Sequence, residues 1–145
     1  VGSILPLVYL PEGNTVSLIY RLASGLLQER RSVAHGPLTE ALAVTDRAVA
    51  QNAVDADQTG ADAIADGERV HVLFIDQESR QIFHTHRDRD GHWAAATRQT
   101  EGVTAQWVRG ARLVDGETRV YGYVFDAGSD GGSGKNRYAR IVLDD

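Results

Sequence analysis

The sequence predicts an all-β fold of about three four-stranded antiparallel sheets, and three observations lead to this prediction. A turn ending in glycine precedes an alternating, β-rich segment three times, at Gly13, Gly67 and Gly116. These glycines stand 54 and 49 residues apart, so the pattern repeats along the chain. Each repeat also has an apolar segment before the turn and a further strand-like segment after the alternating one.

The repeats divide the chain into residues 1–50, 51–100 and 101–145. The strands that we expect cover residues 4–10, 14–20, 26–33 and 38–44 in the first repeat, 61–65, 68–76, 81–87 and 93–97 in the second, and 107–114, 117–126 and 137–143 in the third. The Ala-rich stretch 39–57 is predicted to be an outer strand followed by a crossing loop. A surface helix is the alternative for this stretch, because alanine favours helices.

Four antiparallel strands that repeat every 49–54 residues are typical of the blades of a β-propeller. Three blades are fewer than the roughly four to eight of ordinary propellers, so two apolar faces would stay uncovered. We therefore expect further sequence or a second chain to complete the propeller. The chain has no Met, even at position 1, which agrees with this expectation.

Composition excludes several classes of site and partner. The net charge of −5 disfavours nucleic acid, whose phosphates need a basic face. No apolar run approaches the roughly 20 residues of a membrane helix, and the N-terminus has no signal-peptide pattern. The absence of Cys excludes disulfides and thiolate zinc sites.

The turn at 88–93 resembles the Asp-box of sialidase-like, BNR-repeat β-propellers, a Ser-x-Asp-x-Gly-x-Thr-Trp pattern between the third and fourth strands of a blade. Asp90, Gly91 and Trp93 match it loosely, while the Ser and Thr are missing and the spacing is shorter. The box is structural, and Trp93 is expected to pack between blades. The superfamily contains glycosidases, polysaccharide lyases, lectins and adhesion modules, and the resemblance implies an extracellular or periplasmic location.

Three histidines are expected to gather on one face of the hairpin 70–87. A turn at Glu78-Ser79 pairs His71 with His86 and places His84 opposite Leu73. A metal site, a catalytic base and ordinary hydrogen-bonded polar residues remain open for this cluster, and we favour the last.

Enzymatic chemistry of this superfamily would need a particular set of residues. The resemblance to BNR-repeat lyases, which use His, Tyr and Arg on a uronic acid, would make these histidines catalytic together with Arg87, Tyr121 and Tyr123. Sialidase chemistry is less well supported, because no Tyr-Glu nucleophile pair is recognisable.

Two further groups of residues are candidate ligand sites. Trp107, Arg109 and Gln106 combine an aromatic face with polar groups that could bind a sugar. Asp126 and Asp130 lie in a Gly-rich acidic loop that could hold Ca²⁺, the one cofactor that the sequence suggests.

The functional prediction is glycan recognition by a propeller module. A polysaccharide-degrading enzyme, with lyase chemistry ahead of hydrolysis, is the first alternative, and a structural or adhesion module without a ligand is the second.

Overall fold

A computed structural model of the chain describes residues 4–51, 59–67, 69–115, 117–126 and 137–143. It is all-β in these residues, with three antiparallel sheets that follow one another along the chain. The first sheet contains β1 (Val8–Leu10), β2 (Thr15–Arg21), β3 (Leu27–Val33) and β4 (Leu42–Ala43); the second contains β5 (Ala61–Asp66), β6 (Arg69–Ile75), β7 (Ile82–Arg87) and β8 (Thr97–Arg98); the third contains β9 (Ala105–Asp115), β10 (Glu117–Asp126) and β11 (Arg137–Leu143). The described part of the chain has no helix that could span a lipid bilayer.

The all-β prediction and the two four-stranded antiparallel sheets are confirmed. The third sheet has three strands in the described residues, where about four per sheet were expected. The helix considered for residues 39–57 is not present in the described part, 39–51, which holds the short β4 and isolated bridges at Val49 and Gln51. Residues 52–58 of that stretch lie outside the described residues.

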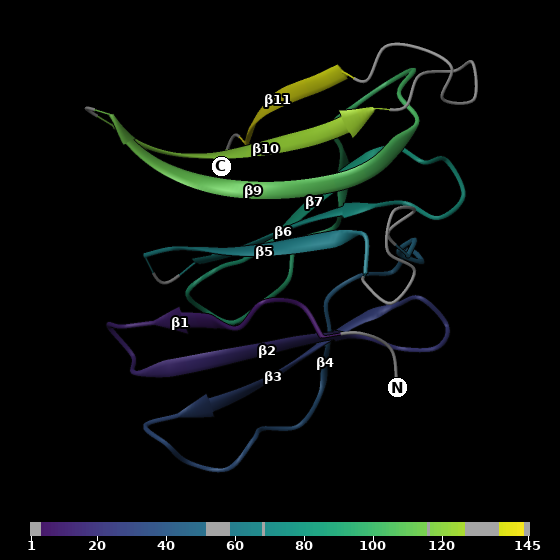
Figure 1. The fold of residues 1–145 in the computed structure, drawn as a ribbon. Coiled ribbons are helices and arrows are strands. Elements are labelled where there is room, and N and C mark those ends of the chain that lie inside the picture. The colour runs from purple at the N-terminus through teal and green to yellow at the C-terminus, as the bar shows by residue number, and fades with distance from the viewer. Residues whose placement is uncertain (1–3, 52–58, 68, 116, 127–136, 144–145) are drawn as a thin grey trace.

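The three sheets lie in an open stack, with the second between the first and the third (Figure 1). Alternation along the strands of the second sheet divides their residues between its interface with the first sheet and its interface with the third. One apolar cluster joins the first two sheets and includes Ile19, Leu27, Val72 and Phe74. A second cluster joins the second sheet to β9 and includes Leu73 and Val108. The second sheet therefore uses opposite faces for its two neighbours.

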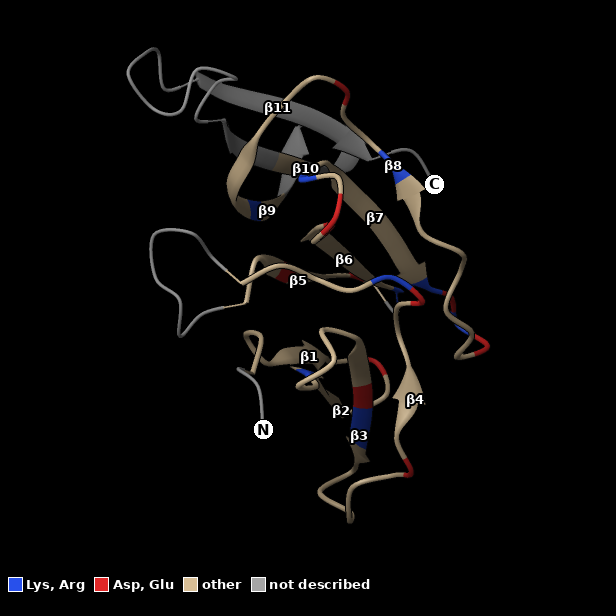
Figure 2. Ribbon diagram, turned by 90° about the vertical axis from the view of Figure 1, so that its right-hand side faces the viewer, with Lys and Arg blue, Asp and Glu red and all other residues tan. Residues whose placement is uncertain are grey.

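A buried carboxylate links the first sheet to the second. β3 carries adjacent acidic and basic residues, as Figure 2 shows, and Glu29 among them is fully buried. Arg87 Nε at the end of β7 donates to Glu29 Oε2 over 3.0 Å, and Trp93 Nε1 donates to Oε1 over 3.3 Å. Ser17 Oγ donates to the same carboxylate. This network joins the two sheets through one buried carboxylate.

The turn between β7 and β8 is closed by a different aspartate from the one that matched the Asp-box. Asp88 Oδ1 accepts the His92 amide over 3.1 Å, and Gly91 adopts φ 85°, a left-handed conformation that suits glycine. The His92 amide is the main reason that the pKa of Asp88 is lowered. Asp88 thus has the turn-closing role that the sequence match placed at Asp90. Trp93 packs against the core between the first two sheets.

Candidate functional site

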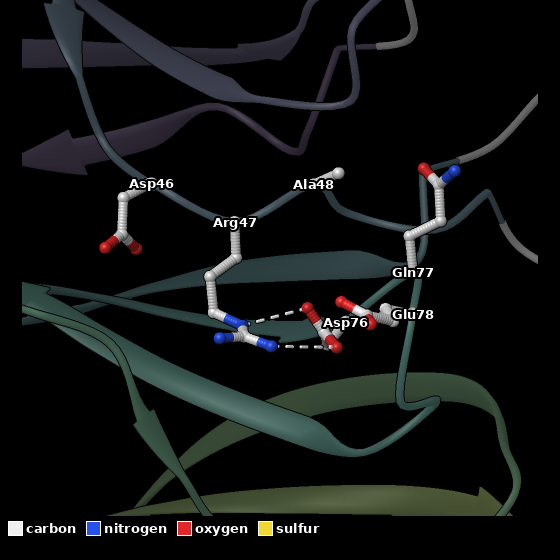
Figure 3. A pocket seen from close by; sticks show the side chains of 6 residues that line it. All are labelled: Asp46, Arg47, Ala48, Asp76, Gln77 and Glu78. Carbon is white, nitrogen blue, oxygen red and sulfur yellow. Dashed lines mark hydrogen bonds and ion pairs between the residues drawn. The ribbon is translucent and has the colours of Figure 1, made fainter.

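A polar cleft of about 510 Å³ opens where the connection from β4 to β5 meets the loop after β6 (Figure 3). It is lined by Asp46, Arg47, Ala48, Asp76, Gln77 and Glu78. Its volume lies within the roughly 300–1,000 Å³ of small-molecule sites.

The backbone brings these two segments together by continuing the second sheet. Ala50 N donates to Ile75 O and Gln77 N donates to Ala48 O, both over 2.9 Å. Val49 forms an isolated antiparallel bridge with Asp76. The connection therefore runs along the end of β6 and holds residues 46–48 opposite the loop.

An ion pair with two hydrogen bonds crosses the cleft. Arg47 Nε lies 2.9 Å from Asp76 Oδ1, and Arg47 Nη2 lies 3.2 Å from Oδ2. The guanidinium also lies over the Phe83 ring, 4.4 Å from its centroid. Ser79 donates to Asp76 Oδ2 through its amide, over 2.8 Å, and through its hydroxyl, over 2.6 Å. The Asp76 carboxylate therefore accepts hydrogen bonds both from Arg47, in the connection from β4 to β5, and from Ser79, in the loop after β6.

The ion pair changes the pKa values of both partners. Burial acts to raise the pKa of Asp76, but the hydrogen bonds from Arg47 and Ser79 outweigh it, so the pKa is lowered. The hydrogen bond to Asp76 is also the main reason that the pKa of Arg47 is raised. Both groups are charged at neutral pH.

We expect Asp76→Asn to lower the free energy of unfolding by about 1.5 kcal/mol at pH 7, because charge-assisted hydrogen bonds are lost. A lowered pKa in the folded state means that this stabilisation is present above about pH 4 and is lost as the pH falls further. Urea unfolding from pH 7 to pH 3 should therefore show the difference between wild type and variant shrinking with acid. Asp46→Asn is the control, and an equal pH dependence for both variants would contradict the assignment to Asp76.

The remaining polar groups of the cleft are open to solvent. Asp46, Gln77 and Glu78 are exposed. In Figure 3, Arg47, Asp76 and Glu78 point toward one another, while Asp46 and Gln77 flank them on either side. With three carboxylates and one guanidinium, the cleft carries a net negative charge. It offers many hydrogen-bond acceptors and one fixed cationic donor.

Sequence reasoning missed this cleft. The cleft is built from two loop segments, and its central ion pair joins Arg47 to Asp76, 29 residues further along the chain. Neither segment has a sequence pattern that indicates a site. The one local signal was the spacing Asp76-x-x-Ser79, in which the aspartate accepts a hydrogen bond from the Ser79 amide three residues on. This spacing indicates a turn rather than a site.

The three histidines do lie together on the second sheet, in the predicted register. His71 is paired with His86, and Leu73 with His84. The ring centroids are 5.2–6.0 Å apart, and His71 Nδ1 lies 3.0 Å from His84 Nε2. His71 and His84 are buried, while His86 is half-buried. In the described residues, no cluster of three or more His, Asp or Glu side chains has the geometry of a metal site.

The other residues of the predicted catalytic set are not on this face. Arg87 follows His86 in β7, so it lies on the opposite face, where it binds Glu29. Tyr121 and Tyr123 are in β10, opposite Ala111 and Arg109 of β9. Gly122, which lies between them, is paired with Gly110 of β9, and the Gly110 amide contacts the second sheet. By alternation, positions 121 and 123 therefore belong to the face of the third sheet that is turned away from the second sheet.

The predicted glycan-binding residues Gln106, Trp107 and Arg109 lie in β9 and are all half-buried. The Arg109 guanidinium lies 4.8 Å from the centroid of the Trp107 ring. It therefore covers part of the aromatic surface that a sugar would need. The pKa of Asp62 is raised, mainly because the carboxyl is buried. The hydrogen bond from the Gly110 amide and the charge of Arg109 partly offset this effect.

The predicted calcium site falls mostly outside the described residues. Asp126 ends β10, and Asp130 lies in the segment 127–136, which is not described.

The described residues form stacked antiparallel sheets, with an acidic, open cleft beside the end of β6. No family model matches the chain, and no curated protein matches its sequence. The chain's own residues are therefore the basis for assigning a function.

Proposed function

We propose that this chain is a carbohydrate-recognition module and that its ligand site is the cleft around Arg47 and Asp76. The observation that carries the proposal is a cleft of about 510 Å³ with exposed carboxylate and amide groups around a fixed guanidinium. Sugar hydroxyls donate to carboxylate and amide oxygens and accept from guanidinium N–H groups. Asp46, Gln77 and Glu78 are exposed and would meet such hydroxyls from the open side of the cleft.

The charge of the cleft favours neutral glycans over acidic ones. Three carboxylates surround one arginine, and that arginine is paired with Asp76. A uronate would meet like charges, and its carboxylate would have to displace Asp76 from the bidentate pair. The lyase alternative has less support, since it needs cationic groups around a uronate and its predicted residues are divided between two faces of a sheet.

We also propose that each sheet is a blade of a BNR-repeat type β-propeller. Consecutive antiparallel strands in the order 1-2-3-4 support this proposal, as does the aspartate-closed turn between β7 and β8. A structure of the chain in its native assembly would show whether the sheets surround a central axis.

The double variant Gln77→Ala/Glu78→Gln should weaken binding of neutral oligosaccharides about 10-fold, which corresponds to the loss of one or two hydrogen bonds. Isothermal titration with neutral gluco- and galacto-oligosaccharides, and with a polygalacturonate for comparison, measures this. Both residues are exposed, so the fold should be unaffected. Glu12→Gln, an exposed charge change in the turn before β2, is the matched control.

Two results would contradict the assignment. Tighter binding of the polygalacturonate would exclude a preference for neutral glycans. Loss of binding in Trp107→Ala, with the cleft variants unchanged, would move the ligand site to β9.

A further inference from the structure

The cleft between the β4–β5 connection and the loop after β6 carries more negative charge than its arginine neutralises. Asp46, Asp76 and Glu78 supply three carboxylates, and Arg47 is the one cation among the described residues that line the cleft. Arg47 is already compensated, because Asp76 holds it through two hydrogen bonds. Within the described part of the chain, the carboxylates of Asp46 and Glu78 have no ion pair or hydrogen bond of their own.

Both of these carboxylates lie close enough to Arg47 to act on its charge. The hydrogen bond to Asp76 is the main reason that the pKa of Arg47 is raised, and the charges of Asp46 and Glu78 add to this effect. In Figure 3, Glu78 points toward the Arg47–Asp76 pair, and Asp46 flanks that pair. Like charges with one counter-ion repel each other, so a second cation beside Glu78 would be stabilised there.

The next cation along the cleft does not fill this position. Arg21 Nη2 and Gln77 Oε1 both approach Gly25, each 3.3 Å from the point where a Cβ of that glycine would lie. Arg21 Nε donates to Val49 O over 2.8 Å. The Arg21 guanidinium therefore lies at the Gln77 end and is held by the backbone rather than by a carboxylate of the cleft.

We infer that the cleft prefers glycans with a primary ammonium group, such as oligomers of glucosamine, to neutral glycans. This inference rests on the proposed function, that the cleft binds glycans, and adds the charge of the ligand to it. The ammonium would pair with the Glu78 carboxylate beside the Arg47–Asp76 pair, and Asp46 would add to the attraction from the flank. An ammonium group offers three donors and the positive charge that these two carboxylates lack. Because Glu78 is exposed, we expect a gain of about 5-fold in affinity, as for other exposed ion pairs.

Isothermal titration of the 145-residue chain with the trimers of glucosamine and of N-acetylglucosamine tests this inference, because acetylation removes the ammonium charge. At about pH 5.5 and low salt, where the amines are protonated and the carboxylates ionised, the glucosamine trimer should bind about 5-fold more tightly. This difference should disappear at about 1 M salt, where the Debye length is about 3 Å.

The variants assign the preference to particular carboxylates. Glu78→Gln keeps the size of the side chain and removes its charge, so it should abolish the difference between the trimers. Asp46→Asn should reduce the difference. Glu12→Gln makes the same change of net charge in the turn before β2, and it should leave the difference intact.

Equal affinity for the two trimers would overturn the inference while leaving the glycan site in place. A preference that survives Glu78→Gln would also overturn it. Binding of trilysine as tight as that of the glucosamine trimer would do the same, since the cleft would then recognise an amine without a sugar. If neither trimer binds, the proposed function is contradicted as well.

Discussion

Glu29→Leu is expected to lower the free energy of unfolding by about 3–5 kcal/mol, because it leaves a buried guanidinium without its counter-ion. The Arg87 side chain is 4% exposed and that of Glu29 is 0% exposed. Burial is the main cause of the lowered pKa of Arg87, and the Glu29 charge partly offsets it. No described group accepts a hydrogen bond from Arg87 Nη2, so Glu29 is its principal compensation. Such a loss is a large part of the stability of a typical domain.

Urea unfolding at pH 7 measures this loss, with the exposed Glu40→Gln as the control. The double variant Glu29→Leu/Arg87→Met should be more stable than Glu29→Leu, since removing both charges also removes the uncompensated one. If Glu29→Leu stays within about 0.5 kcal/mol of the wild type, the network does not hold the first two sheets together.

Gly110→Ala is expected to cost about 1–3 kcal/mol of stability through overpacking at the interface of the second and third sheets. A Cβ at position 110 would overlap Ile64 Cδ1 and lie 2.7 Å from Ile64 Cγ1. The glycine is needed for close approach, because its amide donates to Asp62 Oδ2 over 2.8 Å. A side chain there would push β9 away from this buried carboxylate.

A double-mutant cycle with Ile64→Ala tests this explanation. Gly110→Ala/Ile64→Ala should be more stable than the sum of the single changes by about 1 kcal/mol, because truncating Ile64 makes room for the new methyl. Gly13→Ala, where the new methyl meets only the Thr15 hydroxyl, is the control. Additive changes would show that steric overlap with Ile64 is not the cause.

Strands and their pairing were predictable because they depend on local patterns. The register of β6 and β7 agrees with the prediction, with His71 opposite His86 and Ile75 opposite Ile82. The turn itself is wider than the two residues expected, since Asp76 N donates to Gln81 O. It is centred on the same point, so the pairing of the strands is unchanged.

The predicted grouping of Arg87 with the three histidines was wrong, and strand alternation alone could have shown this. Arg87 was grouped with the histidines by residue type, but it follows His86 directly and so faces the other way. Its partner Glu29 lies 58 residues earlier, in another sheet. No local pattern indicates such a pair.

By itself, the sequence determined an all-β chain of repeated antiparallel hairpins and a histidine cluster on one of them, because hydrophobic alternation and turn residues act over a few positions. Only the tertiary structure decided which sheet faces meet, that Glu29 neutralises Arg87, and that residues 46–48 and 76–78 form a cleft. These features depend on how sheets stack and where connections cross them, and stacking is a property of whole faces rather than of neighbouring residues.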